Sequence, residues 1–257
     1  MEYSIKNCLI SMLFFLYLKE IRFRLFYCFI SLLYSWFICF TFIEEVIYYF
    51  AKPLLVANYK SSDLFTHFIF TNLGDAFFSF FNLSLAIGCF ISFYFFIFQL
   101  FCYIVPSLYF YEKNIFVLIV LSSIFALAFS SVFWYGIFMP TICYFFLGFE
   151  LTNTFLSFEI LFEGKIDEYF TLVLGSLYSL AIIFQFPILL LFLVVFGLLD
   201  IRFLVAYRKI IYFGFLVVSA FLTPPDVFSQ FLFICPFLVF YEFVIFLTFY
   251  FNEYKQD

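Results

Sequence analysis

Two short polar segments carry the residues whose types and spacing could bind a charged partner. Glu20 and Arg22 lie in "YLKEIRFRL" (17–25), and Glu112 and Lys113 lie in "YIVPSLYFYEKN" (103–114). One interpretation is a charged belt where lipid meets water, in which such pairs stabilise the protein by less than about 1 kcal/mol. The other is that two carboxylates on one side of a membrane bind a partner's arginines, because a guanidinium fork matches carboxylate oxygens.

Two further polar residues, Gln185 in "FQFP" and Glu242 in "FYEF", lie inside long apolar runs. Polar groups are costly in hydrocarbon, so both side chains are expected to face the protein interior or water. Gln185 also precedes Pro187, where a freed backbone carbonyl needs a donor. For Glu242, a proton-relay role and a role in helix packing or partner contact both remain open.

The segment "LTPPDVFSQ" (222–230) predicts a capped turn between two helices. Thr223 would cap the second helix, Pro224 would take its first position, and Asp226 follows three residues after the cap. Pro225 prevents the preceding helix from continuing. Gln230 then adds a polar group one turn into the new helix.

Other residue types exclude several kinds of chemistry. The seven cysteines form no C-x-x-C pair and His67 is the one histidine, which argues against a metal site and excludes a haem held by paired histidines. The sequence carries no phosphate-binding loop or hydrolase motif. We therefore expect no cofactor, no enzymatic activity and no nucleic-acid partner.

Composition predicts an integral membrane protein, because 67% of the 257 residues are hydrophobic and 11% are charged, against about 25% charged in soluble domains. Charge-free runs place the membrane spans, since about 20 apolar residues cross the hydrocarbon layer. The fifth run covers thirteen residues, about 20 Å of helix, so the last two helices are expected to be short and to thin the bilayer locally. The six predicted spans are residues 25–43, 76–105, 115–139, 169–199, 210–222 and 227–251.

The expected fold is an all-α, polytopic single membrane domain over residues 1–257, in which residues 1–24 form an N-terminal interfacial segment. With six spans, nine of the twelve basic residues fall on the side that holds both termini. Both termini are therefore expected to face the cytoplasm, or the matrix or stroma of an organelle.

Five separated motifs resemble those of the TatC family, the multispanning receptor subunit of the twin-arginine protein translocase. The resemblance runs from about residue 16 to 250, in family order. The matching segments are Tyr17–Arg24 for "H-L-x-E-L-R-x-R", Pro53 in "AKPLL" for the proline of the family's first periplasmic loop, Pro106 to Lys113 for "P-x-L-x-x-x-E-[KR]", Phe184 to Pro187 for "F-E-x-P", and the intact "LTPPDxxSQ" at 222–230.

The resemblance implies a protein that binds signal peptides with paired arginines and supports proton-gradient-driven transport of folded proteins. It implies that Glu20, Arg22, Glu112 and Lys113 belong to the signal-peptide site. It further implies that single-span TatA/TatB-type subunits dock near Thr223, Asp226 and Gln230, with Glu242 nearby, and that the chain forms a homo-oligomer within a larger complex.

Three departures from the family pattern and two alternative functions accompany the resemblance. Lys113 and Asn114 replace a more basic pair. Gln185 replaces the family's glutamate, and the first-loop pattern at residues 71–77 loses its proline and carries Asp75 in place of glutamate. An ion or solute carrier using Glu242 and Gln185, or a structural subunit of a respiratory complex, are the alternatives. Because 52 phenylalanines indicate a T-rich organellar genome, the mitochondrial inner membrane is the expected location, ahead of a plastid thylakoid or bacterial inner membrane.

Overall fold

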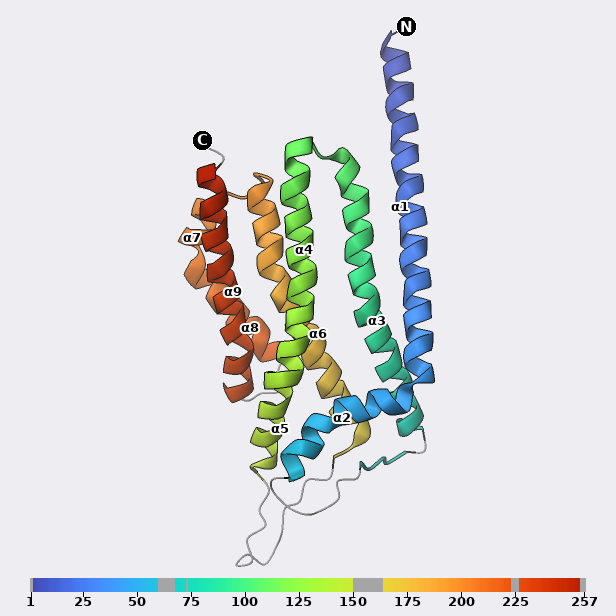
Figure 1. Cartoon of the computed structure of the whole chain (residues 1–257), viewed down its shortest axis with the longest axis vertical. Coiled ribbons are helices and arrows are strands. Elements are labelled where there is room, and N and C mark those ends of the chain that lie inside the picture. Colours follow the sequence, from blue (N-terminus) through green and yellow to red (C-terminus); the bar gives the residue numbers. More distant parts are fainter. Residues whose placement is uncertain (1, 60–67, 73, 150–163, 223–226, 255–257) are drawn as a thin grey trace, which may run out of the picture.

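The structure, a computed structural model, is a bundle of long helices with both termini at the same end (Figure 1). It describes the backbone of residues 2–59, 68–72, 74–149, 164–222 and 227–254. The side chains that it describes are those of residues 15–57, 68–72, 74–106, 108–109, 113–149, 164–221 and 227–249. The helices that run between the ends of the bundle are α1 (Glu2–Thr41), α3 (Asp75–Ile104), α4 (Phe110–Phe133) with α5 (Met139–Leu147), α6 (Ile166–Val195), α8 (Arg208–Leu222) and α9 (Val227–Tyr254).

Five segments are long and apolar enough to cross a membrane within the described chain. The all-helical membrane fold predicted from composition is thus confirmed, whereas the count of six spans stays a prediction, because α8 has only 15 residues. The prediction of a short sixth helix is wrong, since α9 has 28 residues, about 42 Å. The five segments are Phe15–Thr41, Asp75–Ile104, Lys113–Leu147, Ile166–Val195 and Val227–Phe249.

α1 is one continuous helix, so no break separates the predicted N-terminal segment 1–24 from the first span. It packs antiparallel against α3 through small residues. The Ser35 hydroxyl donates a hydrogen bond to the Gly88 carbonyl over 2.8 Å, and a Cβ on Gly88 would lie 2.8 Å from Cα of Trp36. Such close approach of two backbones requires residues without bulk at the crossing.

Small residues recur every four positions on both sides of this crossing. Because antiparallel helices keep a constant register, the pair Ser35–Gly88 places the neighbouring small residues of the two helices opposite one another. We call this line of contact the α1–α3 seam. Its members are Ser31, Ser35 and Cys39 on α1, and Ser84, Gly88 and Ser92 on α3.

The third span passes through Pro140 and ends at Leu147, beyond the end predicted at residue 139. A π-helical turn, η2 (Trp134–Phe138), ends two residues before the proline and joins α4 to α5. Its wider ring accommodates the missing N–H and the bulk of proline. The Trp134 indole in this turn donates to the Ser176 hydroxyl over 2.9 Å, which fixes the turn against α6.

Pro53, expected in a loop, lies inside the helix α2 (Ile43–Tyr59), which crosses one end of the bundle (Figure 1). Proline in a helix leaves the carbonyl four residues earlier, here that of Tyr49 in the preceding turn, without its usual donor. The Tyr169 hydroxyl on α6 donates to one carbonyl of that turn, Phe50, over 2.9 Å. α2 therefore closes this end of the bundle as a helix rather than as a loop.

At the opposite end, Gly197 terminates α6. It has a φ of 72° and donates its N–H to the Val194 carbonyl, while Leu198 donates to Leu193 over 2.9 Å. This pair of bonds is a Schellman motif, in which glycine takes the left-handed position without strain. The chain then turns into the short helix α7 (Ile201–Ala206), held by the Tyr241 hydroxyl on the Leu204 carbonyl.

Candidate functional site

Glu20 is held on α1 by an arginine one turn further along. Nε and one terminal nitrogen of Arg24 donate to the same oxygen, Oε1 of Glu20, at 3.0 and 2.6 Å. The spacing of four residues brings the two side chains together on one helix face. Glu20 remains 40% exposed, whereas Arg24 is 24% exposed, so the carboxylate faces solvent while the guanidinium lies deeper.

Arg24 also connects α1 to the last turn of α3. Its guanidinium donates to Oε1 of Gln99 over 3.2 Å and to the backbone carbonyl of Cys102 over 3.1 Å. The Cys102 carbonyl would bond to the N–H of residue 106 in a continuing helix, but that residue is Pro106, which has none. Pro106, which directly follows the predicted end of the second span at residue 105, lies in the 3-10 turn Val105–Ser107 that follows α3.

Arg22, expected in the site, does not join this cluster. It is exposed, and its guanidinium lies over the ring of Phe23, 5.7 Å from the centroid. Sequence reasoning named Arg22 and missed Arg24 and Gln99. The Glu20–Arg24 spacing of four residues and a glutamine within an apolar run are the two signals that could have found them.

Glu112 and Lys113 lie in the first turn of α4, three residues or fewer from its start. Since α4 begins shortly after the end of α3 against which Arg24 packs, both acidic residues of the predicted site belong to the same end of the bundle (Figure 1). The side chain of Glu112 lies outside the described part of the chain. A carboxylate in the first turn of a helix is favoured by the helix dipole.

The intramembrane glutamine has a partner. Nε2 of Gln185 on α6 donates to the backbone carbonyl of Ser123 on α4 over 2.9 Å. Pro187, two residues later, is buried inside α6. The side chain thus faces the protein interior, as expected for a polar group in a span.

At the α8–α9 hairpin, Nε2 of Gln230 donates to the Leu216 carbonyl on α8 over 2.9 Å. The predicted turn residues Thr223, Pro224, Pro225 and Asp226 lie outside the described residues, so the capped turn stays a prediction. The structure thus places Gln230 in the first turn of α9 and bonds its side chain to α8.

Glu242 lies far from Gln230, contrary to the expected grouping. Twelve residues of α9 separate them, about 18 Å along the helix. Glu242 instead faces the start of α8, where it accepts a hydrogen bond from the Tyr212 hydroxyl and lies 3.3 Å from the Arg208 guanidinium. This pairing gives the carboxylate inside α9 a cation and a hydrogen-bond donor from α8.

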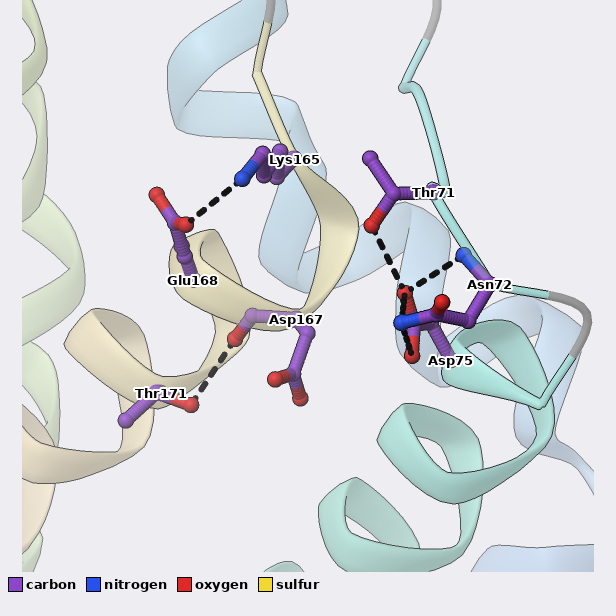
Figure 2. Close-up of polar contacts among 7 residues, drawn as sticks. All are labelled: Thr71, Asn72, Asp75, Lys165, Asp167, Glu168 and Thr171. Carbon is purple, nitrogen blue, oxygen red and sulfur yellow. Dashed lines mark hydrogen bonds and ion pairs between the residues drawn. The ribbon is translucent and has the colours of Figure 1, made fainter.

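The other end of the bundle holds a second polar cluster, drawn in Figure 2. There the predicted first-loop pattern folds back on itself: the Asp75 carboxylate accepts bonds from the Asn72 backbone N–H at 2.9 Å and the Thr71 hydroxyl at 3.1 Å. Across a cavity of about 200 Å³, Lys165 pairs with Glu168 at 3.3 Å in the first turn of α6. The segments that precede α3 and α6 are joined by backbone hydrogen bonds, from the Ile69 N–H to the Gly164 carbonyl over 3.1 Å and from the Ile166 N–H to the Ile69 carbonyl over 3.2 Å.

Among the residues that the structure describes, no group of three histidine, cysteine, aspartate or glutamate side chains could hold a metal ion. The arrangement offers charged and polar groups at the two ends of an apolar bundle. It suits binding of charged segments at a membrane face.

These features define a multi-pass helical membrane protein with a carboxylate-bearing face at the end that holds its termini. The sequence matches the family model described as "Sec-independent protein translocase protein (TatC)" over residues 16–236. The chain belongs to the TatC family.

Relatives and solved structures agree with this assignment. The chain is 34% identical to a tatC-like protein, ymf16, of Reclinomonas americana, over 90% of this chain and 85% of that one. It is 30% identical to the Sec-independent protein translocase protein TatC of Rickettsia prowazekii, with 88% of each covered. A crystal structure of the twin-arginine translocase receptor TatC in the detergent DDM matches with a TM-score of 0.73 and 30% identity, over 90% of this chain and 99% of that chain.

Proposed function

We propose that this protein is the receptor component of a twin-arginine translocase and that Glu20 binds signal peptides bearing paired arginines. The observation that carries the proposal is the placement of Glu20: its carboxylate is fixed by Arg24 beside the end of α3, yet remains 40% exposed. A guanidinium can donate a charge-assisted hydrogen bond to such a carboxylate. Glu112, in the first turn of α4 at the same end, would provide the second carboxylate, with Lys113 beside it.

This role requires that the end of the bundle holding both termini face the compartment from which cargo arrives, the cytoplasm or the matrix. The excess of basic residues assigned to that side supports this orientation. The hairpin end, with Gln230, would then lie toward the trans side and dock single-span TatA/TatB-type subunits, within a complex holding more than one copy of this chain. The proton gradient would drive transport, as in the family.

The phenylalanine-rich composition supports a mitochondrial inner membrane location, ahead of a plastid thylakoid or a bacterial inner membrane. Finding the gene in a mitochondrial genome would support it, and finding it in a bacterial chromosome would contradict it.

The test uses the full chain in vesicles and a signal peptide carrying a photo-cross-linker beside its arginine pair. Glu20→Ala and Glu112→Ala are expected to lower cross-linking while complex assembly is retained. Lys19→Gln is the matched control, because Lys19 is an exposed charged residue adjacent to Glu20. Cross-linking at the level of the unmodified chain in both alanine variants would contradict the proposal.

The two alternative classes differ in simple measurements. An ion or solute carrier would show flux by the purified protein alone. A structural subunit of a respiratory complex would co-purify with cofactor-bearing subunits and show no affinity for peptides with paired arginines. The pairing of Glu242 with Arg208 and Tyr212 weighs against the carrier, because it occupies the carboxylate that a transport pathway would use.

A further inference from the structure

We propose that Arg24 is the positioning residue of the signal-peptide site, and that Gln99 and the Cys102 carbonyl are its anchors. In this arrangement Arg24 holds Oε1 of Glu20 so that Oε2 meets a guanidinium of the peptide. The inference rests on the proposed role of Glu20 and names the residues that prepare it.

The Arg24 guanidinium bonds to groups on both α1 and α3. Arg24 makes four hydrogen bonds from three nitrogens: two to Oε1 of Glu20, one to Gln99 and one to the Cys102 carbonyl. A planar fork can reach acceptors on two helices at once, which the compact ammonium of lysine cannot reproduce. Both bonds to Glu20 end on one oxygen, so Oε2 is the oxygen that Arg24 does not use.

The Cys102 carbonyl on α3 is available to Arg24 because of the residue four positions later. Pro106 lacks the N–H that would bond to the Cys102 carbonyl, and the carboxyl end of a helix attracts positive charge. Arg24 supplies the missing donor and a positive charge at the same point. The proline that ends α3 thereby also creates the anchor for the residue that orients Glu20.

The register of α1 against α3 brings Arg24 opposite Gln99. Eleven residues separate Arg24 from Ser35 on α1, and eleven separate Gly88 from Gln99 on α3. Eleven residues make about three helical turns, so both contacts lie on the same faces of the two helices. The α1–α3 seam therefore delivers Arg24 to Gln99, and the position of Glu20 follows from the packing of small residues about 16 Å away.

The experiment measures the affinity of a synthetic signal peptide with paired arginines for the full chain in lipid nanodiscs. Glu20→Gln is expected to weaken binding about tenfold, because it removes a charge-assisted hydrogen bond. Arg24→Gln is expected to weaken binding about fivefold when Glu20 is present, and to have no further effect in the Glu20→Gln background. Lys19→Gln serves as the control for loss of a neighbouring positive charge.

Two further variants separate positioning from charge and from general stability. Arg24→Lys keeps the charge but not the fork, and should bind the peptide as weakly as Arg24→Gln. Gln99→Leu removes one anchor and should weaken binding by about twofold to threefold, again only when Glu20 is present.

The outcomes separate the role of Glu20 from the role of Arg24. If Glu20→Gln binds the peptide normally, the proposed function of Glu20 fails and the role of Arg24 with it. If Glu20→Gln weakens binding but Arg24→Gln binds equally well or more tightly, then Arg24 is a bystander or a competitor of the peptide, and the positioning role is overturned. Equal losses from Arg24→Gln with and without Glu20 would also overturn it, because they would reflect loosening of the helices.

Discussion

Nε2 of Gln185 on α6 lies 2.9 Å from the backbone carbonyl of Ser123 on α4 and donates a hydrogen bond to it. An amide can donate at any pH, whereas a carboxyl group can donate only when it holds a proton. The glutamine that replaces the family's glutamate thus forms a permanent bond between two membrane helices. A role at this position that depends on a proton is not available to this chain.

Gln185→Glu should therefore make stability depend on pH. The protonated carboxyl can donate to Ser123 and the ionised one cannot, so stability should fall as pH rises, by about 1–3 kcal/mol once the group is ionised. Thermal unfolding in detergent at pH 5 and pH 8, relative to the unmodified chain at each pH, measures this. Gln185→Leu is the control, since it loses the bond without adding a titratable group, and an equal loss for Gln185→Glu at both pH values would contradict the prediction.

Gly88→Ala should force α1 and α3 apart. The added Cβ would lie 2.8 Å from Cα and 2.9 Å from N of Trp36, both backbone atoms that no rotamer change can move. We expect the free energy of unfolding to fall by about 1–3 kcal/mol, as for other overpacked sites.

Gly175→Ala is the matched control for Gly88→Ala, because its added Cβ meets nothing within 4 Å. Alanine is also a better helix former than glycine by about 1 kcal/mol, so this variant should be as stable as the unmodified chain or more stable. Equal stability of the two alanine variants, measured by thermal unfolding, would show that the α1–α3 seam tolerates separation.

The Arg208–Glu242 pair should contribute modestly to stability. Both side chains are more than a third exposed, at 38% and 45%, so solvent screens the pair. A double-mutant cycle with Arg208→Gln and Glu242→Gln should give a coupling of less than about 1 kcal/mol that shrinks in 1 M salt, where the screening length is about 3 Å. A coupling of several kcal/mol that is insensitive to salt would indicate a buried pair instead.

Gln230→Leu should disturb docking of single-span subunits more than binding of signal peptides. The side chain ties the first turn of α9 to α8 through the Leu216 carbonyl, and leucine cannot donate that bond. Loss of one such bond weakens docking by about fivefold. Co-purification of a single-span subunit and signal cross-linking are measured on the same sample, and equal loss of both would indicate general misfolding.

The sequence predicted the long apolar helices well, because a span without charges has few alternatives in lipid. It failed where tertiary contacts rescue a local break. Pro53 was expected in a loop, and the third span was predicted to end at residue 139, just before Pro140. Helices instead run through both positions, with the Tyr169 hydroxyl bonded beside Pro53 and a π turn, Trp134–Phe138, beside Pro140. The partners of Glu242, Arg208 and Tyr212 on α8, could be assigned only from the packing of α8 against α9.

For the candidate site, the sequence predicted Glu20 together with Arg22, whereas in the structure Glu20 pairs with Arg24. Arg22 is two residues from Glu20 and Arg24 is four, and the four-residue spacing places Arg24 on the same helix face as Glu20. Gln99 lies 75 residues away from Arg24 and could be assigned only after the register of α1 against α3 was known. The small residues at four-residue intervals in residues 31–39 and 84–92 carry that register, and they are visible in the sequence.

The α1–α3 seam makes the number of residues between Arg24 and Ser35 as important for the site as the residue types in that interval. Deleting one residue between Arg24 and Ser35 would turn Arg24 by about 100° around α1, away from Gln99. Substitution of one bulky apolar residue for another on the lipid side of α1 would leave that angle unchanged. A gene that drifts toward phenylalanine can therefore keep a working receptor, whereas the number of codons in this interval is fixed by the spacing of two hydrogen bonds.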